Sequence, residues 1–346
     1  CAPLGMGCWV LLSALLAPWL VALVILVLLC PCCPRRLKQK TFSFGLRMIW
    51  PFRYDIRITG LSSLPKDQGI LFMPNHPALI DPIIMLSYLT KRFCIHPVVA
   101  EQVYLNNKRA FDMTDPLPVP DFGEGTNSYT KHVMREVLQG VVDKLEQKKS
   151  VLMYPAGRLM RSGEHFVEVG NSAAFDVLSL RKSEKPWRVC LVHVDGLWGS
   201  RFSMAYTDSQ PRFFKELKKG ICELFCGFLL FMPKRRIDIR FELLDEIPAF
   251  EDKLAMNQFL KSKYNESGPE SLAKPGDKEH VRGKGRVPTS CCSSKVRPLP
   301  ELTGSAPQMD EELDPKVVNK VLPALAKHLG KPVSQLEVSQ DLSFDL

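Results

Sequence analysis

One histidine and one aspartate stand five positions apart in an otherwise apolar run, "LFMPNHPALIDPIIML" (71–86). A buried strand that leads into a helix has no packing reason to hold them. If His76 ends the strand, Asp81 can reach its Nδ1 atom and fix the tautomer. The Nε2 atom then stays available to take a proton from an attacking hydroxyl. The pair alone fits equally a loop histidine bonded to a helix-capping aspartate, so both interpretations stand.

A second polar cluster follows another apolar run, in "VLMYPAGRLMRSG" (151–163), where Arg158 comes directly after Gly157. The planar guanidinium group binds two phosphate oxygens at once, so Arg158 is suited to hold a phosphorylated substrate. A plain surface arginine is the alternative. No serine or cysteine lies in the His76 motif, so the chemistry favoured there is direct transfer onto an external hydroxyl.

Three blocks in this order resemble the glycerolipid acyltransferases, the lysophospholipid acyltransferase family with its His-x4-Asp motif. His76 and Asp81 occupy the two motif positions. The block at 151–163 is similar to the family's Phe-Pro-Glu-Gly block, which contacts the acceptor's phosphate. Because Arg follows Gly here, this block and "LVHVDGLWGSRFS" (191–203) are most similar to one branch. That branch is the acyltransferase part of the bifunctional acyl-carrier-protein synthetase/2-acylglycerophosphoethanolamine acyltransferases.

The resemblance covers about residues 53–250 and implies roles for single residues. His76 would be the general base and Asp81 its orienting partner. The implied substrate-binding residues are Asn75, Tyr154, Pro155, Gly157, Arg158 and Arg161. No metal or other cofactor is implied, and an acyl-carrier protein or acyl-CoA would be the acyl donor. One departure stands out, because Ala156 replaces the family's glutamate. Either the acceptor is held differently or activity is reduced.

Strands and helices alternate through the middle of the chain. Apolar or alternating runs predict strands at 54–60, 69–76, 94–100, 150–155, 188–196 and, near a sheet edge, 236–248. Helical spacing predicts helices at 77–90, 128–149 and 171–182. This order predicts an α/β domain, over residues 53–262, with a mostly parallel sheet flanked by helices. The resemblance implies the glycerol-phosphate acyltransferase fold. The apolar stretch 221–232 is either a core helix or an element in the lipid interface.

The first 33 residues predict a membrane location. Residues 8–33 hold 26 positions without a charge, enough for a helix to cross the ~30 Å hydrocarbon core. A re-entrant hairpin bent at Pro18 is one alternative, and a signal peptide is another, although the basic n-region is missing. Basic residues follow in the juxtamembrane stretch 34–52, which places the catalytic domain on the cytoplasmic face.

Composition changes after the domain. Residues 263–308 are rich in Ser, Pro, Gly and charge, which predicts a disordered linker. Residues 309–346 then start with an amphipathic helix and resemble the beginning of an acyl-carrier-protein domain, truncated before the serine that would carry phosphopantetheine. An unrelated helix is the alternative. Since the chain also starts at Cys1, we expect a piece of a longer protein that has a carrier domain.

The net charge and the cysteine content indicate which classes of binding partner and which compartment to expect. A net charge of +9 favours anionic partners, such as phospholipid headgroups or nucleic acid. Nucleic acid is the weakest option, because the basic residues lie beside the apolar segment and the linker without interleaved aromatic residues. Eleven cysteines without a metal-binding spacing favour a reduced cytosolic compartment. Cys30, Cys32 and Cys33, at the membrane edge, are candidates for reversible acylation.

These observations predict a membrane-anchored enzyme. It would move a fatty acyl group from an acyl thioester onto the hydroxyl of a lysophospholipid or glycerophosphate. Its partners would be membrane phospholipid and the acyl-carrier protein or acyl-CoA. The alternative is an acyltransferase-like module that binds lipid or carrier protein without turnover, and Ala156 is the feature that favours it.

Overall fold

The computed structural model describes part of the chain: residues 30, 32–111, 113–120, 128–167, 173–181, 187–206, 210–226, 233–246, 248–272 and 274–277. All of them lie in the first of two compact units, Cys1–Lys295. Residues 1–29 and 31 of the expected membrane segment lie outside the described residues. So does the whole carrier-like segment 309–346, which belongs to the second unit, Val296–Leu346. Within the described ranges, no helix is both long and apolar enough to cross a membrane.

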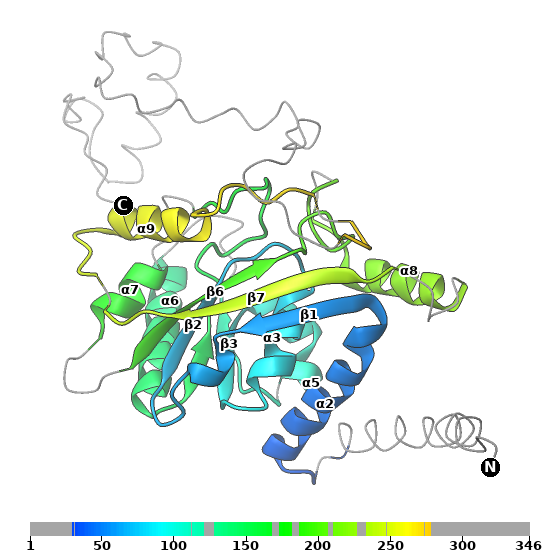
Figure 1. Cartoon of the computed structure of the whole chain (residues 1–346). Coiled ribbons are helices and arrows are strands. Elements are labelled where there is room, and N and C mark those ends of the chain that lie inside the picture. Colours follow the sequence, from blue (N-terminus) through cyan, green and yellow to red (C-terminus); the bar gives the residue numbers. More distant parts are fainter. Residues whose placement is uncertain are drawn as a thin grey trace, which may run out of the picture. The chain divides into compact units, whose positions relative to one another are not determined.

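Seven strands and their connecting helices make up the described part of this unit (Figure 1). The strands are β1 (Tyr54–Thr59), β2 (Ile70–Pro74), β3 (Ile95–Ala100), β4 (Leu117–Val119), β5 (Ser150–Leu152), β6 (Arg188–Asp195) and β7 (Arg235–Leu243). The helices are α2 (Arg35–Arg53), η1 (Leu61–Ser63), α3 (Asp81–Leu89), α4 (Glu101–Asn106), α5 (Lys108–Phe111), α6 (Ser128–Glu146), α7 (Ala173–Ser179), α8 (Phe213–Cys226) and α9 (Lys253–Tyr264).

The strands form one sheet in the order β1-β7-β6-β2-β5-β3-β4. All neighbouring pairs are parallel except β6 and β7, which are antiparallel. The prediction of a mostly parallel α/β sheet is therefore confirmed. Because of the one antiparallel pair, the carboxyl ends of β2, β5 and β6 share an edge with the amino ends of β1 and β7. We call this the carboxyl edge.

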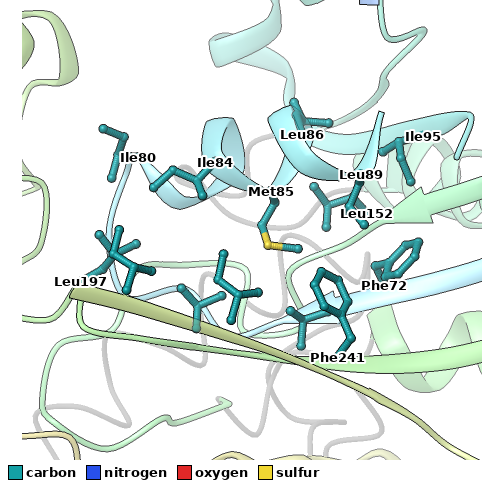
Figure 2. Close-up of a cluster of buried hydrophobic side chains, with 14 of the residues drawn as sticks. Phe72, Ile80, Ile84, Met85, Leu86, Leu89, Ile95, Leu152, Leu197 and Phe241 are labelled. Atoms are coloured by element: carbon teal, nitrogen blue, oxygen red, sulfur yellow. The ribbon is translucent and has the colours of Figure 1, made fainter. Parts of the chain in front are cut away.

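Strand β2 is buried on both faces, as its continuous apolar run predicts. Phe72 belongs to a hydrophobic cluster under α2 and α3, where Ile84, Met85 and Leu89 are almost fully buried (Figure 2). Its neighbour Met73 points the other way, into a second cluster formed with α6, α7 and α9. Each such side chain contributes about 1.5–3 kcal/mol on burial, so these two clusters fix the strand that leads to His76.

Several boundaries differ from the predictions. Helix α3 begins at Asp81 rather than at Pro77, because Pro82 is the proline of its first turn. Helix α8 begins eight residues before the apolar stretch 221–232, whose last six residues lie outside the described part of the chain. Strand β7 ends at Leu243 rather than at residue 248, and it lies near the sheet edge as predicted, between β1 and β6.

The folded unit also extends beyond the predicted domain on both sides. Helix α2 packs on α3, where the Trp50 indole donates a hydrogen bond to the Ser87 hydroxyl at 3.0 Å. At the other end, Glu270 is 1% exposed and its backbone N–H donates to the Gly163 carbonyl at 2.7 Å. The start of the expected linker is therefore ordered on the domain, and the boundary at 262 was placed too early.

Candidate active site

The structure brings His76 and Asp81 together. His76 Nδ1 lies 3.0 Å from Asp81 Oδ2, and the same oxygen accepts a hydrogen bond from the Ala78 N–H at 3.2 Å. Because the carboxylate accepts, Nδ1 carries the proton and Nε2 keeps its lone pair. Among the described residues, none forms a hydrogen bond with Nε2, and the imidazole side chain is 15% exposed. This is the arrangement that a general base needs.

The position of Asp81 follows from the chain path. Residues 77–80 form a loop between β2 and α3, and Asp81 is the first residue of the helix. Its side chain is 1% exposed, and its charge is favourably placed at the positive end of the helix dipole. A buried carboxylate needs partners, and the histidine and the loop N–H supply them for one oxygen.

The second oxygen of this carboxylate, Oδ1, is buried and makes no hydrogen bond with the described residues. The buried hydroxyl of Tyr154 is likewise unpaired there. Burial and the nearby Asp81 charge raise the pKa of Tyr154 well above its usual value, so the phenol keeps its proton. The Tyr154 ring also packs on the His76 imidazole, with ring centroids 4.3 Å apart. Tyr154 therefore covers the pair from one side.

Asn75 anchors the strand end from the other side. Its Oδ1 accepts from the Val194 N–H at 2.7 Å, and its Nδ2 donates to the Val194 carbonyl at 2.9 Å. Nδ2 also lies 2.8 Å from Nε2 of His165, which is buried. With its amide used in this way and 3% exposure, Asn75 holds the His76 backbone against β6. Its amide atoms are engaged in these contacts, and the predicted role of Asn75 in substrate binding stays a prediction.

The second block turns directly beside the histidine. The Gly157 N–H donates to the Tyr154 carbonyl at 3.0 Å, which closes a β-turn over Pro155 and Ala156. Gly157 has φ of +63°, a left-handed conformation that favours glycine. Further on, the Met160 N–H donates to the His76 carbonyl at 2.8 Å. The turn is thereby fixed against the first block.

The predicted phosphate-binding residues lie on and after this turn. Gly157 is exposed, Arg158 is half-buried and Arg161 is exposed. Since the His76 carbonyl anchors Met160, both arginines belong to a segment held at the carboxyl edge.

The third block, residues 191–203, is held at the carboxyl edge by hydrogen bonds, some of them to residues that the sequence analysis did not identify. The Phe202 carbonyl accepts from the Leu79 N–H at 3.0 Å and so fixes the loop before Asp81. The buried Arg235 donates to the Gly196 carbonyl at 3.0 Å, and Glu270 Oε1 accepts from the Gly196 N–H at 2.5 Å. Glu270 and Arg235 come from distant segments, so no local pattern could have identified them.

A separate hollow of about 580 Å³ opens at the amino ends of β1 and β7, hence on the carboxyl edge. It contains no residue of the His76 motif. Aromatic and charged side chains line it: Trp50, Tyr54, Asp55, Arg57, Tyr88, Lys234, Arg236 and Asp277. Its charges are mixed and partly paired, for Arg57 lies 3.3 Å from Asp55 and Arg236 lies 2.9 Å from Asp238.

Two comparisons with known proteins gave matches to this chain. A family model described as Acyltransferase matches residues 55–183, which contain the His76 motif and the 151–163 block. The third block lies outside the matched range. Among solved structures, the chain is similar to the 1-acyl-sn-glycerophosphate (LPA) acyltransferase PlsC from Thermotoga maritima, at 13% sequence identity and a TM-score of 0.42. That match covers 74% of this chain and 90% of the other.

Proposed function

We propose that this protein transfers a fatty acyl group from an acyl thioester to the hydroxyl of a lysophospholipid or glycerophosphate. The observation that carries the proposal is the His76–Asp81 pair, within the segment that matches the acyltransferase family model. The fit of the 151–163 block to a phosphate-bearing acceptor supports the choice of acceptor. The donor would be an acyl-carrier protein or acyl-CoA, and the branch would be that of the 2-acylglycerophosphoethanolamine acyltransferases.

In this mechanism, the acceptor phosphate binds at Gly157, Arg158 and Arg161. His76 Nε2 takes the proton of the acceptor hydroxyl as its oxygen attacks the thioester carbonyl. Asp81 stabilises the imidazolium that forms, 3.0 Å from Nδ1. Collapse of the tetrahedral intermediate breaks the C–S bond, and the imidazolium returns the proton to the leaving thiolate. These reaction steps balance without a cofactor and without a covalent acyl-enzyme intermediate.

We also propose that the protein works at the cytoplasmic face of a membrane. Helix α2 supports this location, since it exposes the apolar side chains Leu37, Phe44, Met48, Ile49 and Phe52. Basic residues flank these side chains along the same helix. An apolar stripe with basic flanks is suited to lie in the interface of an anionic membrane.

Replacement of the base tests the function. In His76→Ala, we expect transfer from decanoyl-CoA to lysophosphatidic acid or lysophosphatidylethanolamine to fall by about 10²–10⁴-fold. Vesicle binding should be unchanged, since the side chain is only 15% exposed. His132→Gln is the matched control, because His132 is exposed on α6. Near-normal turnover in His76→Ala would exclude this mechanism.

The same assay decides the alternative function, a binding module without turnover, which Ala156 favours. Binding of lysolipid vesicles by the unaltered protein, with no product from either acyl-CoA or acyl-carrier-protein donors, would support that alternative.

A further inference from the structure

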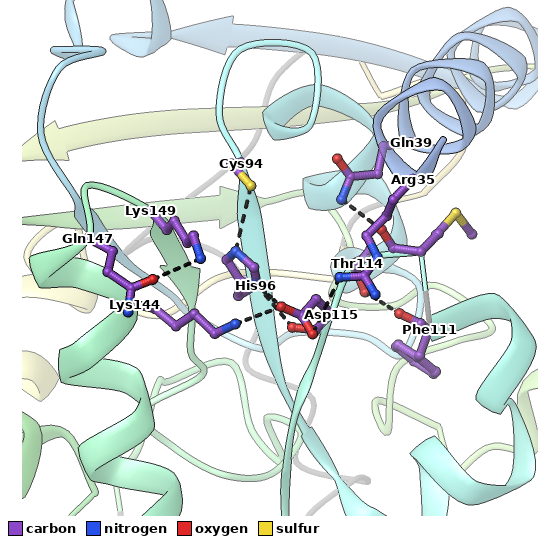
Figure 3. A network of polar contacts seen from close by, with 11 residues as sticks. Arg35, Gln39, Cys94, His96, Phe111, Thr114, Asp115, Lys144, Gln147 and Lys149 are labelled. Atoms are coloured by element: carbon purple, nitrogen blue, oxygen red, sulfur yellow. Dashed lines mark hydrogen bonds and ion pairs between the residues drawn. The ribbon is translucent and has the colours of Figure 1, made fainter. Parts of the chain in front are cut away.

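A second histidine stands beside a cysteine at the opposite edge of the sheet. Cys94 directly precedes β3, which runs parallel to β5 and, through it, to β2. His76 follows the carboxyl end of β2, so Cys94 lies at the far edge. Its Sγ atom lies 3.6 Å from Nε2 of His96, as Figure 3 shows. Cys94 is exposed, whereas the His96 side chain is 5% exposed.

The other ring nitrogen fixes the tautomer of His96. Nδ1 lies 3.0 Å from the Asp115 carbonyl oxygen and 3.3 Å from its Oδ2. Both are acceptors, so Nδ1 carries the proton and the Nε2 lone pair faces the thiol. Burial lowers the pKa of His96, which keeps the imidazole neutral and able to accept a proton near pH 7.

Asp115 is itself held in place. Lys144 on α6 donates to its Oδ2 at 2.6 Å, and Arg35 on α2 lies 3.5 Å from Oδ1. Its backbone has φ of +51°, a left-handed conformation that is uncommon outside glycine. The positive charges of Lys144 and Lys149 act on His96 as well.

A thiol, a base within hydrogen-bonding reach and a third group that orients the base are the signature of an activated nucleophile. We propose that Cys94, His96 and Asp115 form such a centre, at which Cys94 accepts an acyl group from an acyl thioester. The substrate class rests on the proposed function, which brings acyl thioesters to this protein. Cys222, on α8, is also exposed and has no histidine partner among the described residues.

The reaction is a transthioesterification, in which the acyl group moves from the donor thiol to the Cys94 thiol. His96 Nε2 takes the Cys94 proton, and the sulfur attacks the thioester carbonyl. The new bond joins Cys94 Sγ to the acyl carbon, the bond from that carbon to the donor sulfur breaks, and His96 passes the proton to the leaving thiolate. One thioester replaces another, so no oxidant or reductant is needed.

Acylation of the purified full chain by decanoyl-CoA tests the proposal, with mass spectrometry of intact protein and of its peptides. We expect an acyl group on Cys94, removed by neutral hydroxylamine, and labelling of Cys94 at least tenfold faster than of Cys222. Cys94→Ser should lose this label, and His96→Gln should slow it by about 10²-fold or more. Since His96 is buried, the comparison of Cys94 with Cys222 in unaltered protein keeps the test decisive if that variant does not fold.

Equal labelling of Cys94 and Cys222, or no label on Cys94, would overturn the proposal. Lysophospholipid acylation, measured in the same preparation, separates this result from the main function. Cys94→Ser should retain that activity, whereas His76→Ala should lose it and still be labelled on Cys94. Lysophospholipid acylation without Cys94 labelling refutes the nucleophilic centre alone. Cys94 labelling without lysophospholipid acylation refutes the proposed function and leaves the centre supported.

Discussion

The charge of Asp81 can be removed with little change in shape, which makes Asp81→Asn the sharpest test of the mechanism. The asparagine Oδ1 can replace the oxygen that accepts from His76 Nδ1 and the Ala78 N–H. Its NH₂ group would take the place of the unpaired Oδ1 of Asp81, on the side where Tyr154 offers a hydroxyl oxygen. The hydrogen bonds of the native pair can therefore persist while the carboxylate charge is lost.

The expected loss follows from the geometry. With Nδ1 and Oδ2 3.0 Å apart, the centres of the two charges are separated by about 4 Å in the imidazolium–carboxylate pair. At an effective dielectric constant of about 20, their attraction is about 4 kcal/mol. Since ~1.4 kcal/mol corresponds to a tenfold change in rate, kcat/KM should fall about 10³-fold.

Initial rates of decanoyl transfer to lysophosphatidic acid measure this loss. Asp81 also contributes ~0.3–1 kcal/mol at the start of α3, so the melting temperature should fall by only a few degrees. Asp143→Asn, on the exposed side of α6, is the matched control and should be neutral in both measurements. A folded Asp81→Asn protein with less than a tenfold loss would refute the role assigned to this carboxylate.

Two further predictions concern stability. In Gly163→Ala, the new Cβ would lie 2.4 Å from the Glu270 carbonyl oxygen, so we expect the free energy of unfolding in urea to fall by more than about 1 kcal/mol. Gly140→Ala, in a helix and with its nearest contact at 3.6 Å, should be neutral or stabilising. Equal effects of the two substitutions would contradict the docking of residue 270. Burial lowers the pKa of His96 and His193, so below about pH 6.5 the unfolded chain binds more protons and the melting temperature should fall from pH 7.5 to 5.5. That fall should persist in His132→Gln and flatten in His193→Gln, and a melting temperature that rises on acidification would reverse the expected sign.

The parts of the fold that sequence patterns predicted are those with a strong local signal. Strand β2 is a continuous apolar run and strand β6 is largely apolar, with His193 inside it, because both faces are covered. Such runs are visible in any short window. Helix α9 was missed because its buried side includes Asn257 and Tyr264, which weakens the apolar periodicity. Helix α2 was read only as a basic stretch, since exposed apolar residues interrupt its polar face.

Some residues of the candidate site could likewise be recognised from local sequence patterns, and others could not. His76, Asp81 and Gly157 stand in short motifs, so their types and spacing could be recognised before the structure was known. Glu270 could not, because its contacts with Gly163 and Gly196 join segments 107 and 74 positions away. A segment rich in Ser, Pro and Gly is normally a linker, and only these few long-range hydrogen bonds make it part of the domain.

Ala156, at the position where the resemblance implies a glutamate, bears on a different part of the proposed reaction than the His76–Asp81 pair does. Tyr154 packs against the cluster under α3, where it covers His76, whereas Ala156 packs against the cluster of α6, α7 and α9. The two side chains therefore point to opposite faces of the sheet. No atom of Ala156 takes part in the His76–Asp81 hydrogen bond or in the contacts that hold it. In the proposed mechanism, we therefore expect Ala156 to leave the proton transfer unchanged and to affect only how the acceptor is held. For this reason, turnover at saturating acceptor is the quantity that separates a working enzyme from a binding module.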